Sequence, residues 1–355
     1  MNLHDYVVIF LQSYLQLCGI PYFSSKTSAI KVSIVLPFKN ASPYLRECIE
    51  SILIQKHTDW QLIAVDDHSC DDSKAIIESY QDKRINVIKN KGKGIIEALQ
   101  TTHKYLEGDY VTRMDADDIM PTNKLCTFLK TLESQSNGII ATGNVKYFGE
   151  HEISEGYLRY EAWLNKIADQ QDFYKNIYRE CVVASPNWMM RKKDFDNIQG
   201  FDKLAYPEDY DMVFHWRKAG FIIKSSHQLT HLWREHPDRI SRNSKVYQQE
   251  SFFRLKLGYF LEEFNKKELF LIGTKKKGIV IAKMLKKRKI AFRWFTKTPN
   301  LIGQKKYNVV LENISILPPG GVCILSIYPE KKERQELKDF MKKRGYYIGT
   351  TAHFF

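Results

Sequence analysis

Residues 32–37 read Val-Ser-Ile-Val-Leu-Pro, a short apolar run rich in β-branched side chains that ends at a proline. A run of this length and composition is typical of a strand buried on both faces of a parallel sheet. Similar runs follow at residues 60–65, 85–88 and 110–114, and the segments between them, such as 43–55, carry apolar residues at helical spacing. Strands that alternate with helices predict an α/β fold, in which helices cover both faces of a mixed, mostly parallel sheet.

Polar residues gather where three of these runs end. They are residues 37–40, the pair Asp66-Asp67 and residues 115–118. Ligands of such sheets bind at the carboxyl ends of the strands. We therefore expect the three clusters to meet along one rim of the sheet and to form a binding site there.

The acidic run Asp115-Ala-Asp-Asp118 is the best single candidate for a metal site. Neighbouring carboxylates repel one another unless a cation lies among them, and Mg²⁺ characteristically binds one or two carboxylates together with substrate phosphates. Two-residue spacing on extended backbone places Asp115 and Asp117 on the same side. The alternative is a solvated acidic turn that caps the next helix, with Pro121 just inside that helix.

Three other groups of residues are candidates for the same site. Either carboxylate of Asp66-Asp67 can accept hydrogen bonds from a nucleobase edge or a ribose, unless the pair only caps a helix. Lys91 and Gly92, in the turn after the third run, combine positive charge with backbone that a phosphate can approach closely. Asn187 and Trp188 are candidates for contact with an acceptor sugar, and core packing is the alternative for Trp188.

Two later motifs supply a candidate base and further candidate ligands. Glu208 and Asp209 precede a helical amphipathic pattern, where a carboxylate can cap the helix or act as a general base toward an attacking hydroxyl. Neutral histidine is a possible metal ligand and arginine a clamp for diphosphate, which makes His236 and Arg234 candidates for those roles. A structural role is the alternative for the histidine.

The strand and helix pattern restarts after about residue 265. Strands are expected at 269–273, 290–295, 309–311 and 322–327, and helices at 278–287 and 331–344. The turn Gly273-Thr-Lys-Lys-Lys-Gly278 lacks the G-x-G-x-x-G spacing, which argues against dinucleotide binding. We predict four segments: an N-terminal amphipathic extension (1–29), a first α/β domain (30–245), a helical bridge (246–265) and a small Rossmann-like α/β domain (266–355).

The chain is basic, with a formal net charge of +13 over 355 residues, and the excess is concentrated after Glu263. No RNA-binding signature accompanies the lysine runs, so nucleic acid is not expected as a partner. The alternatives are a solvated face and attraction to an anionic membrane surface, where each basic residue contributes about 1 kcal/mol. Salt-sensitive binding to liposomes would distinguish the two.

Cysteine usage and the N-terminus bear on the compartment. The six cysteines have no paired spacing, which argues against a zinc site or a disulfide framework and fits a reducing cytosol. The apolar residues 7–11 are too few to span a bilayer. We predict an amphipathic helix over 4–19, packed on the body or lying at an interface, and a cytoplasmic protein that can be peripheral at the inner face of the membrane.

Five motifs in order resemble family 2 glycosyltransferases of the GT-A fold, which bind nucleotide sugars. They are residues 32–40, 65–69, 113–119, 207–211 and 234–236, and the resemblance covers about residues 30–245. The C-terminal part resembles the small Rossmann-like unit that is sometimes fused to bacterial members. The resemblance implies an inverting, metal-dependent hexosyltransferase that uses Mn²⁺ or Mg²⁺. It implies a nucleotide-diphosphate sugar donor (a UDP-sugar) and a saccharide or lipid-linked acceptor, in cell-surface polysaccharide biosynthesis.

The same resemblance implies a role for each matching position. Asp209 is the expected base with Glu208 beside it; Asp115, Asp117 and His236 are the expected metal site, with Asp117 in direct contact. The residues expected at the nucleotide sugar are Pro37, Phe38, Asn40, Asp66, Asp67, Lys91, Gly92, Arg113, Asp115 and Arg234.

One segment departs from the family pattern. Asn90-Lys-Gly-Lys-Gly94 carries two lysines where the family has a small or glycine-rich segment, which leaves the donor open. A non-catalytic protein that keeps the fold and docks a nucleotide or a membrane is the alternative function. A sugar nucleotidylyltransferase is disfavoured, because residues 38–41 do not form a glycine-rich phosphate loop.

Overall fold

The computed structural model describes residues 30–133, 137–239 and 248–355, with residue 328 excepted. The helix predicted over 4–19 lies outside the described residues. Residues 31–355 form one compact unit that contains two β-sheets. Within the described residues, no helix has both the length and the apolar character needed to cross a membrane.

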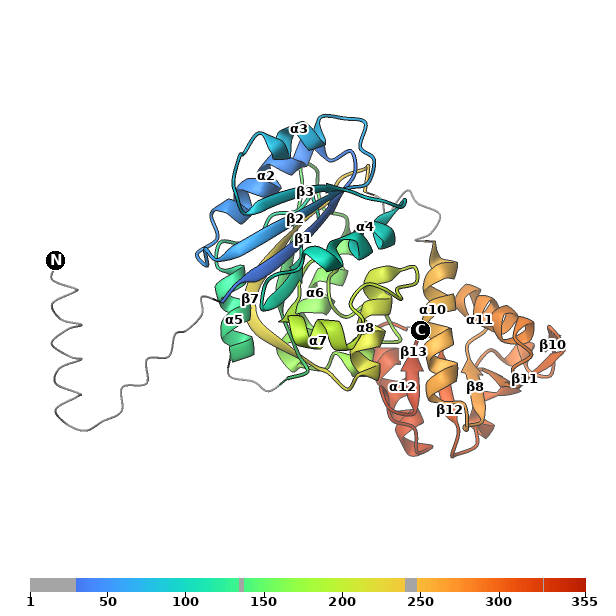
Figure 1. Ribbon diagram of the computed structural model, residues 1–355. Coiled ribbons are helices and arrows are strands. Elements are labelled where there is room, and N and C mark those ends of the chain that lie inside the picture. The colour runs from blue at the N-terminus through green and yellow to red at the C-terminus, as the bar shows by residue number, and fades with distance from the viewer. Residues whose placement is uncertain (1–29, 134–136, 240–247, 328) are drawn as a thin grey trace, which may run out of the picture. The chain divides into compact units, whose positions relative to one another are not determined.

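The first sheet has seven strands in the order β3-β2-β1-β4-β6-β5-β7 (Figure 1). Its four N-terminal strands are parallel and match the predicted runs, whereas β6 is antiparallel to both of its neighbours. The strands are β1 Val32–Phe38, β2 Trp60–Asp66, β3 Ile85–Lys89, β4 Tyr110–Arg113, β5 Ile139–Phe148, β6 Met189–Arg191 and β7 Ile222–Arg234. The mixed, mostly parallel α/β sheet of a GT-A fold is therefore confirmed.

Helices alternate with these strands as the apolar spacing predicts. In α2, for example, Leu45, Ile49 and Ile52 are buried. The helices are α2 Ser42–Leu53, α3 Ser73–Glu78, α4 Ile95–Thr102, α5 Lys124–Glu133, α6 Glu155–Gln170, α7 Lys192–Asn197, α8 Glu208–Lys218 and α10 Gln249–Glu263. One detail differs from expectation: α5 begins three residues after Pro121, so this proline does not lie inside the helix.

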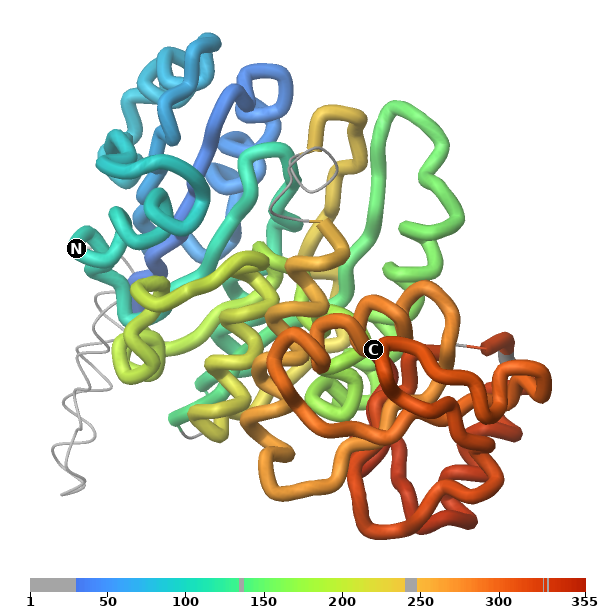
Figure 2. Tube along the Cα trace, turned by 90° about the vertical axis from the view of Figure 1, so that its right-hand side faces the viewer, coloured from blue at the N-terminus to red at the C-terminus, as the bar shows by residue number. Residues whose placement is uncertain are grey.

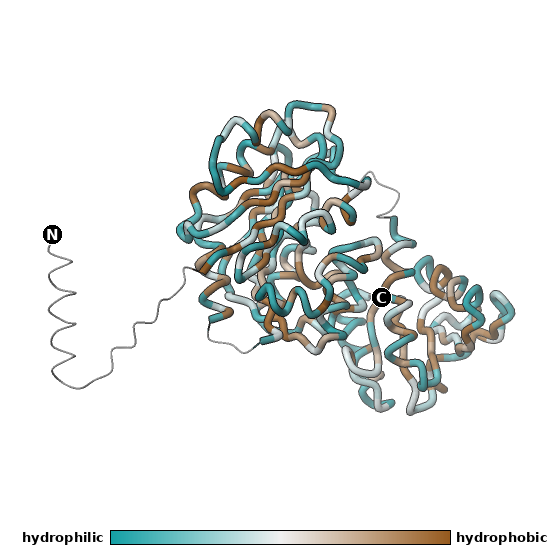
Figure 3. Tube along the Cα trace, viewed as in Figure 1, coloured by the Kyte–Doolittle hydropathy of each residue, from teal (hydrophilic) through white to brown (hydrophobic). Residues whose placement is uncertain are grey.

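The parallel register places the ends of β1, β2 and β4 on one rim. Phe38 pairs with Asp66, and Val35 pairs with Arg113, the residue at which β4 ends. All seven residues of β1 and of β2 are buried, and Figure 3 shows both strands as largely hydrophobic. The chain therefore leaves the apolar core at the same edge three times, and each time the next residues are polar.

The long strands β5 and β7 were not predicted, because their sequences alternate poorly. β7 contains Lys224, His227 and Gln228 among its apolar residues, and the β5–β7 register shifts near Gly143. A Cβ at Gly143 would lie 2.4 Å from Thr230 Oγ1, so only glycine permits this close approach of the two strands. A bridge between Ile119 and Leu232 then ties the segment after β4 to β7.

The second sheet has six strands in the order β10-β11-β9-β8-β12-β13, all parallel except for the β10–β11 hairpin. The structure confirms most of the predicted elements, although β9 begins later than expected and the strands β10 and β13 were missed. The elements are β8 Leu269–Ile272, α11 Lys276–Lys287, β9 Arg293–Thr296, β10 Lys305–Lys306, β11 Val309–Asn313, β12 Val322–Leu325, α12 Lys331–Lys343 and β13 Ala352–Phe354.

Helix α10 joins the two sheets through a shared apolar core. It buries Phe253, Leu257 and Phe260, and the ring of Phe260 packs edge-on against Tyr178 and Phe355. Figure 2 shows α10 leading from the first sheet into the orange and red segments of the second. The predicted bridge is thus a packed helix over the part that the structure describes.

Candidate active site

The three carboxylates of the acidic run have different surroundings. The side chains of Asp115 and Asp117 are 24% and 28% exposed, whereas Asp118 is buried at 1%. Asp115 and Asp117 therefore open onto the rim and Asp118 points into the protein. The interpretation of the run as a solvated turn is wrong for Asp118.

Asp118 connects the acidic run to β7 through two hydrogen bonds. Its Oδ1 accepts a hydrogen bond from the backbone N–H of Arg234 at 2.8 Å, and its Oδ2 lies 2.9 Å from His231 Nε2. Burial, together with the charges of Asp117 and Asp115, raises the pKa of Asp118 well above its usual value, and burial lowers the pKa of His231. Asp118 and His231 are hydrogen-bonded to each other inside the core. Their contact holds the acidic run, and with it the rim carboxylates of Asp115 and Asp117, in place.

Asp117 and His236, expected to be part of one metal site, do meet. His236 Nε2 lies 3.0 Å from Asp117 Oδ2, and the ring of Tyr44 packs 4.4 Å from the imidazole. Burial disfavours the charge of Asp117, but the hydrogen bond with His236 and the positive charge of Arg239 lower the pKa of Asp117 below its usual value. An ionised carboxylate is thus maintained at the rim.

These residues suit a hard divalent cation that also binds substrate phosphate. Among the described residues, no three His, Cys, Asp or Glu side chains form a cluster that could enclose a metal by themselves. The rim offers Asp115 and Asp117, with His236 Nδ1 buried and lacking a hydrogen-bond partner there. One or two carboxylates completed by phosphate is the coordination that Mg²⁺ favours in proteins.

Arg113 links the acidic run to the start of α8. Its Nε donates to Asp115 Oδ1 at 2.9 Å and its Nη1 donates to Glu208 Oε1 at 3.1 Å. Arg113 and Glu208 have side chains only 7% and 3% exposed. The guanidinium is a buried bridge that holds two rim segments together, and the expected contact of Arg113 with the nucleotide sugar stays a prediction.

Replacing Arg113 by methionine is expected to unfold the protein at a lower temperature. Loss of one partner from a buried ion pair typically costs about 3–5 kcal/mol, because the remaining charge stays buried, here on Glu208. We expect Tm to fall by more than about 5 °C in differential scanning fluorimetry. Adding Glu208→Gln should restore at least half of the loss, and an unchanged Tm in the single variant would contradict the bridge.

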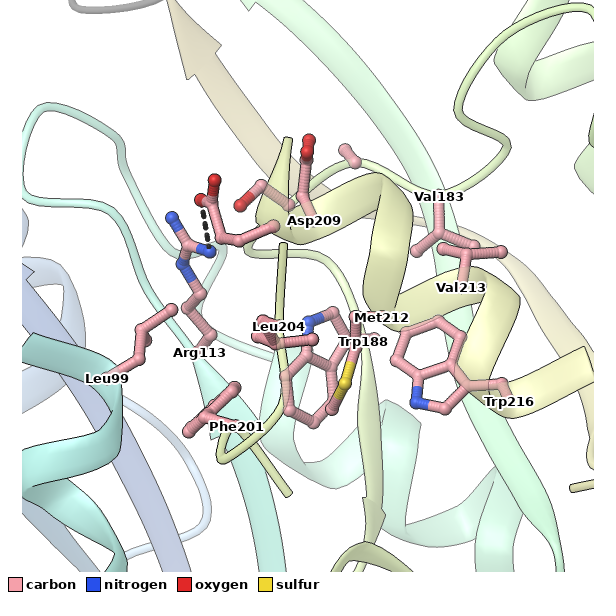
Figure 4. A pocket seen from close by; sticks show the side chains of 13 residues that line it. Leu99, Arg113, Val183, Trp188, Phe201, Leu204, Asp209, Met212, Val213 and Trp216 are labelled. Atoms are coloured by element: carbon pink, nitrogen blue, oxygen red, sulfur yellow. Dashed lines mark hydrogen bonds and ion pairs between the residues drawn. The ribbon is translucent and has the colours of Figure 1, made fainter. Parts of the chain in front are cut away.

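Asp209 lies in the first turn of α8, above an apolar pocket (Figure 4). The lining side chains include Leu204, Met212 and Val213. This burial, with the negative charge of Glu208, raises the pKa of Asp209 to about 7. A carboxylate with such a pKa is suited to take and release a proton near neutral pH.

Hydrogen bonds farther along α8 fix its position. Asp211 Oδ2 accepts from the backbone N–H of Ala205 at 2.7 Å, and Tyr259 Oη donates to Asp211 Oδ1 at 2.6 Å. The rings of Phe214 and Tyr259 stack at 4.2 Å. Helix α10 therefore supports the helix that carries Asp209.

Asp66 and Asp67 organise the rim at the end of β2. Asp66 Oδ1 accepts a hydrogen bond from the backbone N–H of Ser69 at 2.8 Å. Asp67 Oδ1 accepts from Asn90 Nδ2 at 2.7 Å and from the backbone N–H of Gly94 at 2.9 Å. Asp67 thus holds the lysine-containing loop beside the rim, and no pattern in the sequence indicates this pairing.

The loop after β3 is exposed and sharply turned. His68 Nε2 lies 2.8 Å from the carbonyl oxygen of Gly92, and Lys91 is exposed. A Cβ at Gly92 would lie 2.8 Å from Glu97 Cβ, so the turn requires glycine. The loop brings positive charge to the rim through Lys91 and Lys93.

The other residues expected around the nucleotide lie at the end of β1, on the same rim. Pro37 and Phe38 are buried at the end of β1, and Asn40 has a positive φ of 48° just beyond it. Asn40 Oδ1 accepts a hydrogen bond from the backbone N–H of Cys70 at 2.8 Å. The ends of β1 and β2 are therefore joined by side-chain hydrogen bonds.

Arg234 is buried against the acidic run. Its Nε donates to the carbonyl oxygen of Asp117 at 2.7 Å, and its Nη2 donates to Glu47 Oε2 at 2.9 Å. The guanidinium also lies over the rings of Tyr44 and Phe148. In this arrangement Arg234 supports the backbone of Asp117, and the expected clamp on the diphosphate stays a prediction.

The expectation that Asn187 and Trp188 face an acceptor sugar is wrong in this structure. Both side chains are buried, at 1% and 3% exposure. Asn187 Nδ2 donates to the carbonyl oxygen of Gly143, and its Oδ1 accepts from Thr230 Oγ1. Trp188 packs among aromatic rings, including Trp216 at 5.6 Å. Asn187 ties β5 to β7, and Trp188 is core.

Sequence reasoning missed several residues behind the acidic run. Lys124 is buried, its Nζ donates to the carbonyl oxygen of Pro186 at 2.6 Å, and burial lowers its pKa to about 7. His231 was missed because its partner Asp118 lies 113 residues away. Arg239, whose pKa is raised by Asp118 and Tyr147 despite burial, sits next to Glu235. No short-range pattern marks any of these residues.

Sequence comparisons with known proteins find a matching family model and several relatives of this chain. The family model "Glycosyl transferase family 2" matches residues 33–199. Glycosyltransferase GlyG of Streptococcus pneumoniae serotype 4 is 32% identical over 230 residues, which cover 56% of this chain and 75% of GlyG.

Two further relatives are matched over shorter stretches. Glycosyltransferase GlyA of the same strain is 30% identical over 162 residues, 44% of this chain but only 23% of GlyA. The Escherichia coli enzyme WfgD, named as a UDP-Glc:alpha-D-GlcNAc-diphosphoundecaprenol beta-1,3-glucosyltransferase, is 29% identical over 155 residues, 43% of this chain and 57% of WfgD. The matched residues contain the rim at the ends of β1, β2 and β4, and the chain belongs to glycosyltransferase family 2.

Proposed function

We propose that the chain is an inverting, metal-dependent hexosyltransferase of cell-surface polysaccharide biosynthesis. It would move a sugar from a nucleotide diphosphate, with a UDP-sugar as the expected donor, to a saccharide or lipid-linked saccharide. The observation that carries the proposal is the meeting of Asp117 with His236 at 3.0 Å, on the rim that Arg113 connects to Glu208, the residue next to Asp209. Candidate metal ligands and a candidate base thereby lie on adjoining segments.

The donor would lie along the rim. Asp66 or Asp67 would accept hydrogen bonds from the uracil or the ribose, beside Pro37, Phe38 and Asn40. The exposed Lys91 supports this placement, because the loop that carries it is held by Asp67 and offers positive charge to a diphosphate.

Asp117, with Asp115 and His236, would hold Mn²⁺ or Mg²⁺. Such an ion, when bound, offsets the negative charge that builds on the departing diphosphate. Support for these ligands comes from the lowered pKa of Asp117 and from the exposure of both carboxylates at the rim. Arg113 and Asp118 then act as positioning residues, since each is bonded to one end of the run.

Asp209 would take the proton of the acceptor hydroxyl. The acceptor oxygen forms a bond to the anomeric carbon as the bond from that carbon to the diphosphate oxygen breaks, and the electron pair leaves with the diphosphate. Attack from the face opposite the leaving group inverts the configuration. Holding both substrates on one rim converts a two-body encounter into a positioned reaction, which lowers the barrier.

Metal-dependent stabilisation by nucleotides tests the proposal. In a thermal-shift panel of nucleotide sugars and UDP, we expect Tm to rise only when Mn²⁺ or Mg²⁺ is present. A ligand at one hundred times its Kd adds about 2.7 kcal/mol, a shift of several degrees. UMP serves as the control that lacks the diphosphate, and EDTA should abolish the shift. Absence of any shift would favour a non-catalytic protein that keeps the fold.

A further inference from the structure

One stretch supplies nearly all of the net charge of the protein. Residues 269–311 contain ten lysines and two arginines but no aspartate or glutamate, so they account for twelve of the thirteen net positive charges. The stretch runs from β8 through α11 and β9 to β11 in the second sheet. The rest of the chain is close to neutral, which means that the charge belongs to a surface of this unit.

Helix α11, in which Lys283, Lys286 and Lys287 are exposed, lies beside the β10–β11 hairpin (Figure 1). Lys283 Nζ lies over the ring of Tyr307 at 5.6 Å. Lys286 lines a groove together with Asn308 and Val310 of the hairpin. We call the surface formed by Lys283, Lys286, Lys287, Tyr307 and Val310, with Ile302 at its margin, the basic hairpin face.

Large apolar side chains are exposed within the same surface. Ile302, Tyr307 and Val310 are 38%, 43% and 44% exposed, and they are three of the nine large apolar residues exposed in the described part of the chain. All three lie within the nine consecutive residues 302–310. A lysine run alone is usually solvated, but lysines that surround exposed apolar side chains match the interface of a bilayer, where long lysine chains reach the headgroups and apolar groups enter the acyl boundary.

We infer that the basic hairpin face docks on an anionic lipid bilayer. Phospholipid phosphates would meet Lys283, Lys286 and Lys287, and Ile302, Tyr307 and Val310 would insert at the level of the headgroups. Charge complementarity selects an anionic surface. The exposed apolar residues favour lipid over nucleic acid, because a phosphate backbone offers them no apolar partner. Docking on the bilayer does not depend on the transfer reaction. Only the use of a lipid-linked acceptor at that bilayer rests on the proposed function.

Vesicle co-sedimentation tests the inference with the full chain. The vesicles are phosphatidylcholine with about one third phosphatidylglycerol, and pure phosphatidylcholine serves as the neutral surface. The triple variant Lys283→Gln, Lys286→Gln, Lys287→Gln should bind the anionic vesicles roughly a hundredfold more weakly. Wild-type binding should also fall steeply as salt rises from 50 to about 300 mM.

Matched controls separate this face from general positive charge. Lys83, Lys130 and Lys193 are exposed on the first-sheet part of the protein, and their replacement by glutamine should change vesicle binding less than threefold. Equal loss in the two triple variants, or no vesicle binding by the wild type, would overturn the inference. Stronger binding to an RNA oligonucleotide than to the vesicles would also overturn it.

Variants of the apolar residues provide a second test of the inference. Ile302→Ser with Val310→Ser should weaken vesicle binding at least fivefold and leave heparin binding unchanged. Ile316→Ser, at a residue 57% exposed outside the face, should change neither vesicle binding nor heparin binding. Equal vesicle binding by the wild type and the Ile302/Val310 variant would overturn insertion. Metal-dependent nucleotide binding should be retained in every variant, so a failure of lipid docking is distinguishable from a failure of the proposed function.

Discussion

Replacement of Asp209 by asparagine is expected to lower kcat for sugar transfer by about a thousandfold, while the Kd of the nucleotide diphosphate stays within about threefold. General bases typically contribute a factor of about 10² to 10⁴, and asparagine cannot accept the acceptor proton. Asp209 lies in the first turn of α8, and Arg113 joins that turn to the acidic run through Glu208. The measurement is a steady-state transfer assay that follows nucleotide release.

The pH profile gives the same assignment a second check. The pKa of Asp209 is raised to about 7, so the fraction able to accept a proton grows as pH rises. In the free enzyme kcat/KM should therefore increase through about pH 7 and then level off. Asp202→Asn, at an exposed residue in the preceding loop, is the matched control and should leave both kcat and the profile unchanged. A pH-independent kcat/KM between pH 5.5 and 8.5 would contradict Asp209 as the base.

Stability should change in the opposite direction to activity. The folded pKa of Asp209 lies above that of an unfolded aspartate, so the folded state binds this proton more tightly and loses stability as pH rises toward and through about 7. Asp209→Asn escapes this loss. We expect its Tm to exceed that of the wild type by about 2–4 °C at pH 8 and to converge with it near pH 4.

The second large effect is expected at Asp117. Asparagine at this position keeps the shape but removes the charge beside His236. We expect Asp117→Asn to weaken Mn²⁺-dependent binding of UDP by at least about a hundredfold and to lower transfer to a similar degree, because the ion and the diphosphate bind together. Binding is measured by isothermal titration calorimetry at fixed Mn²⁺.

The control for this change is an aspartate whose charge lies elsewhere. Asp169 is exposed and pairs only loosely with His227, at 3.5 Å, so Asp169→Asn should bind UDP as the wild type does. Wild-type affinity in Asp117→Asn would refute its role as the metal ligand, and a matching loss in Asp169→Asn would show that the effect is one of general charge.

The first half of the fold could be predicted because each strand carries its own signal. Residues 32–37 and 60–65 are continuous apolar runs, and buried parallel strands require such runs regardless of what surrounds them. β5 and β7 carry no such signal. Polar residues such as Lys224 and Gln228 interrupt β7, and its place beside β5 depends on Gly143 and on the bond from Asn187 to Gly143. Those contacts join residues more than forty positions apart.

The candidate site, like the fold, could be predicted only in part. Its carboxylates could be found from the sequence, because Asp66, Asp115 and Asp117 follow strand ends that parallel topology brings to one rim. What each polar side chain does there could not be found. Arg113 serves as a buried bridge to Glu208 because of a pairing across ninety-five residues, and Trp188 is core because Trp216 and other rings enclose it.

We propose that one rim of the sheet holds a metal-bound nucleotide through Asp117 and performs proton transfer through Asp209. Calorimetric titration of UDP in the presence of Mn²⁺ separates the two roles when the wild type, Asp117→Asn and Asp209→Asn are compared. We expect Asp209→Asn to bind UDP as tightly as the wild type although its kcat for transfer is about a thousandfold lower. We expect Asp117→Asn to bind UDP at least about a hundredfold more weakly. Wild-type affinity for UDP in Asp117→Asn, or full transfer activity in Asp209→Asn, would contradict these two roles.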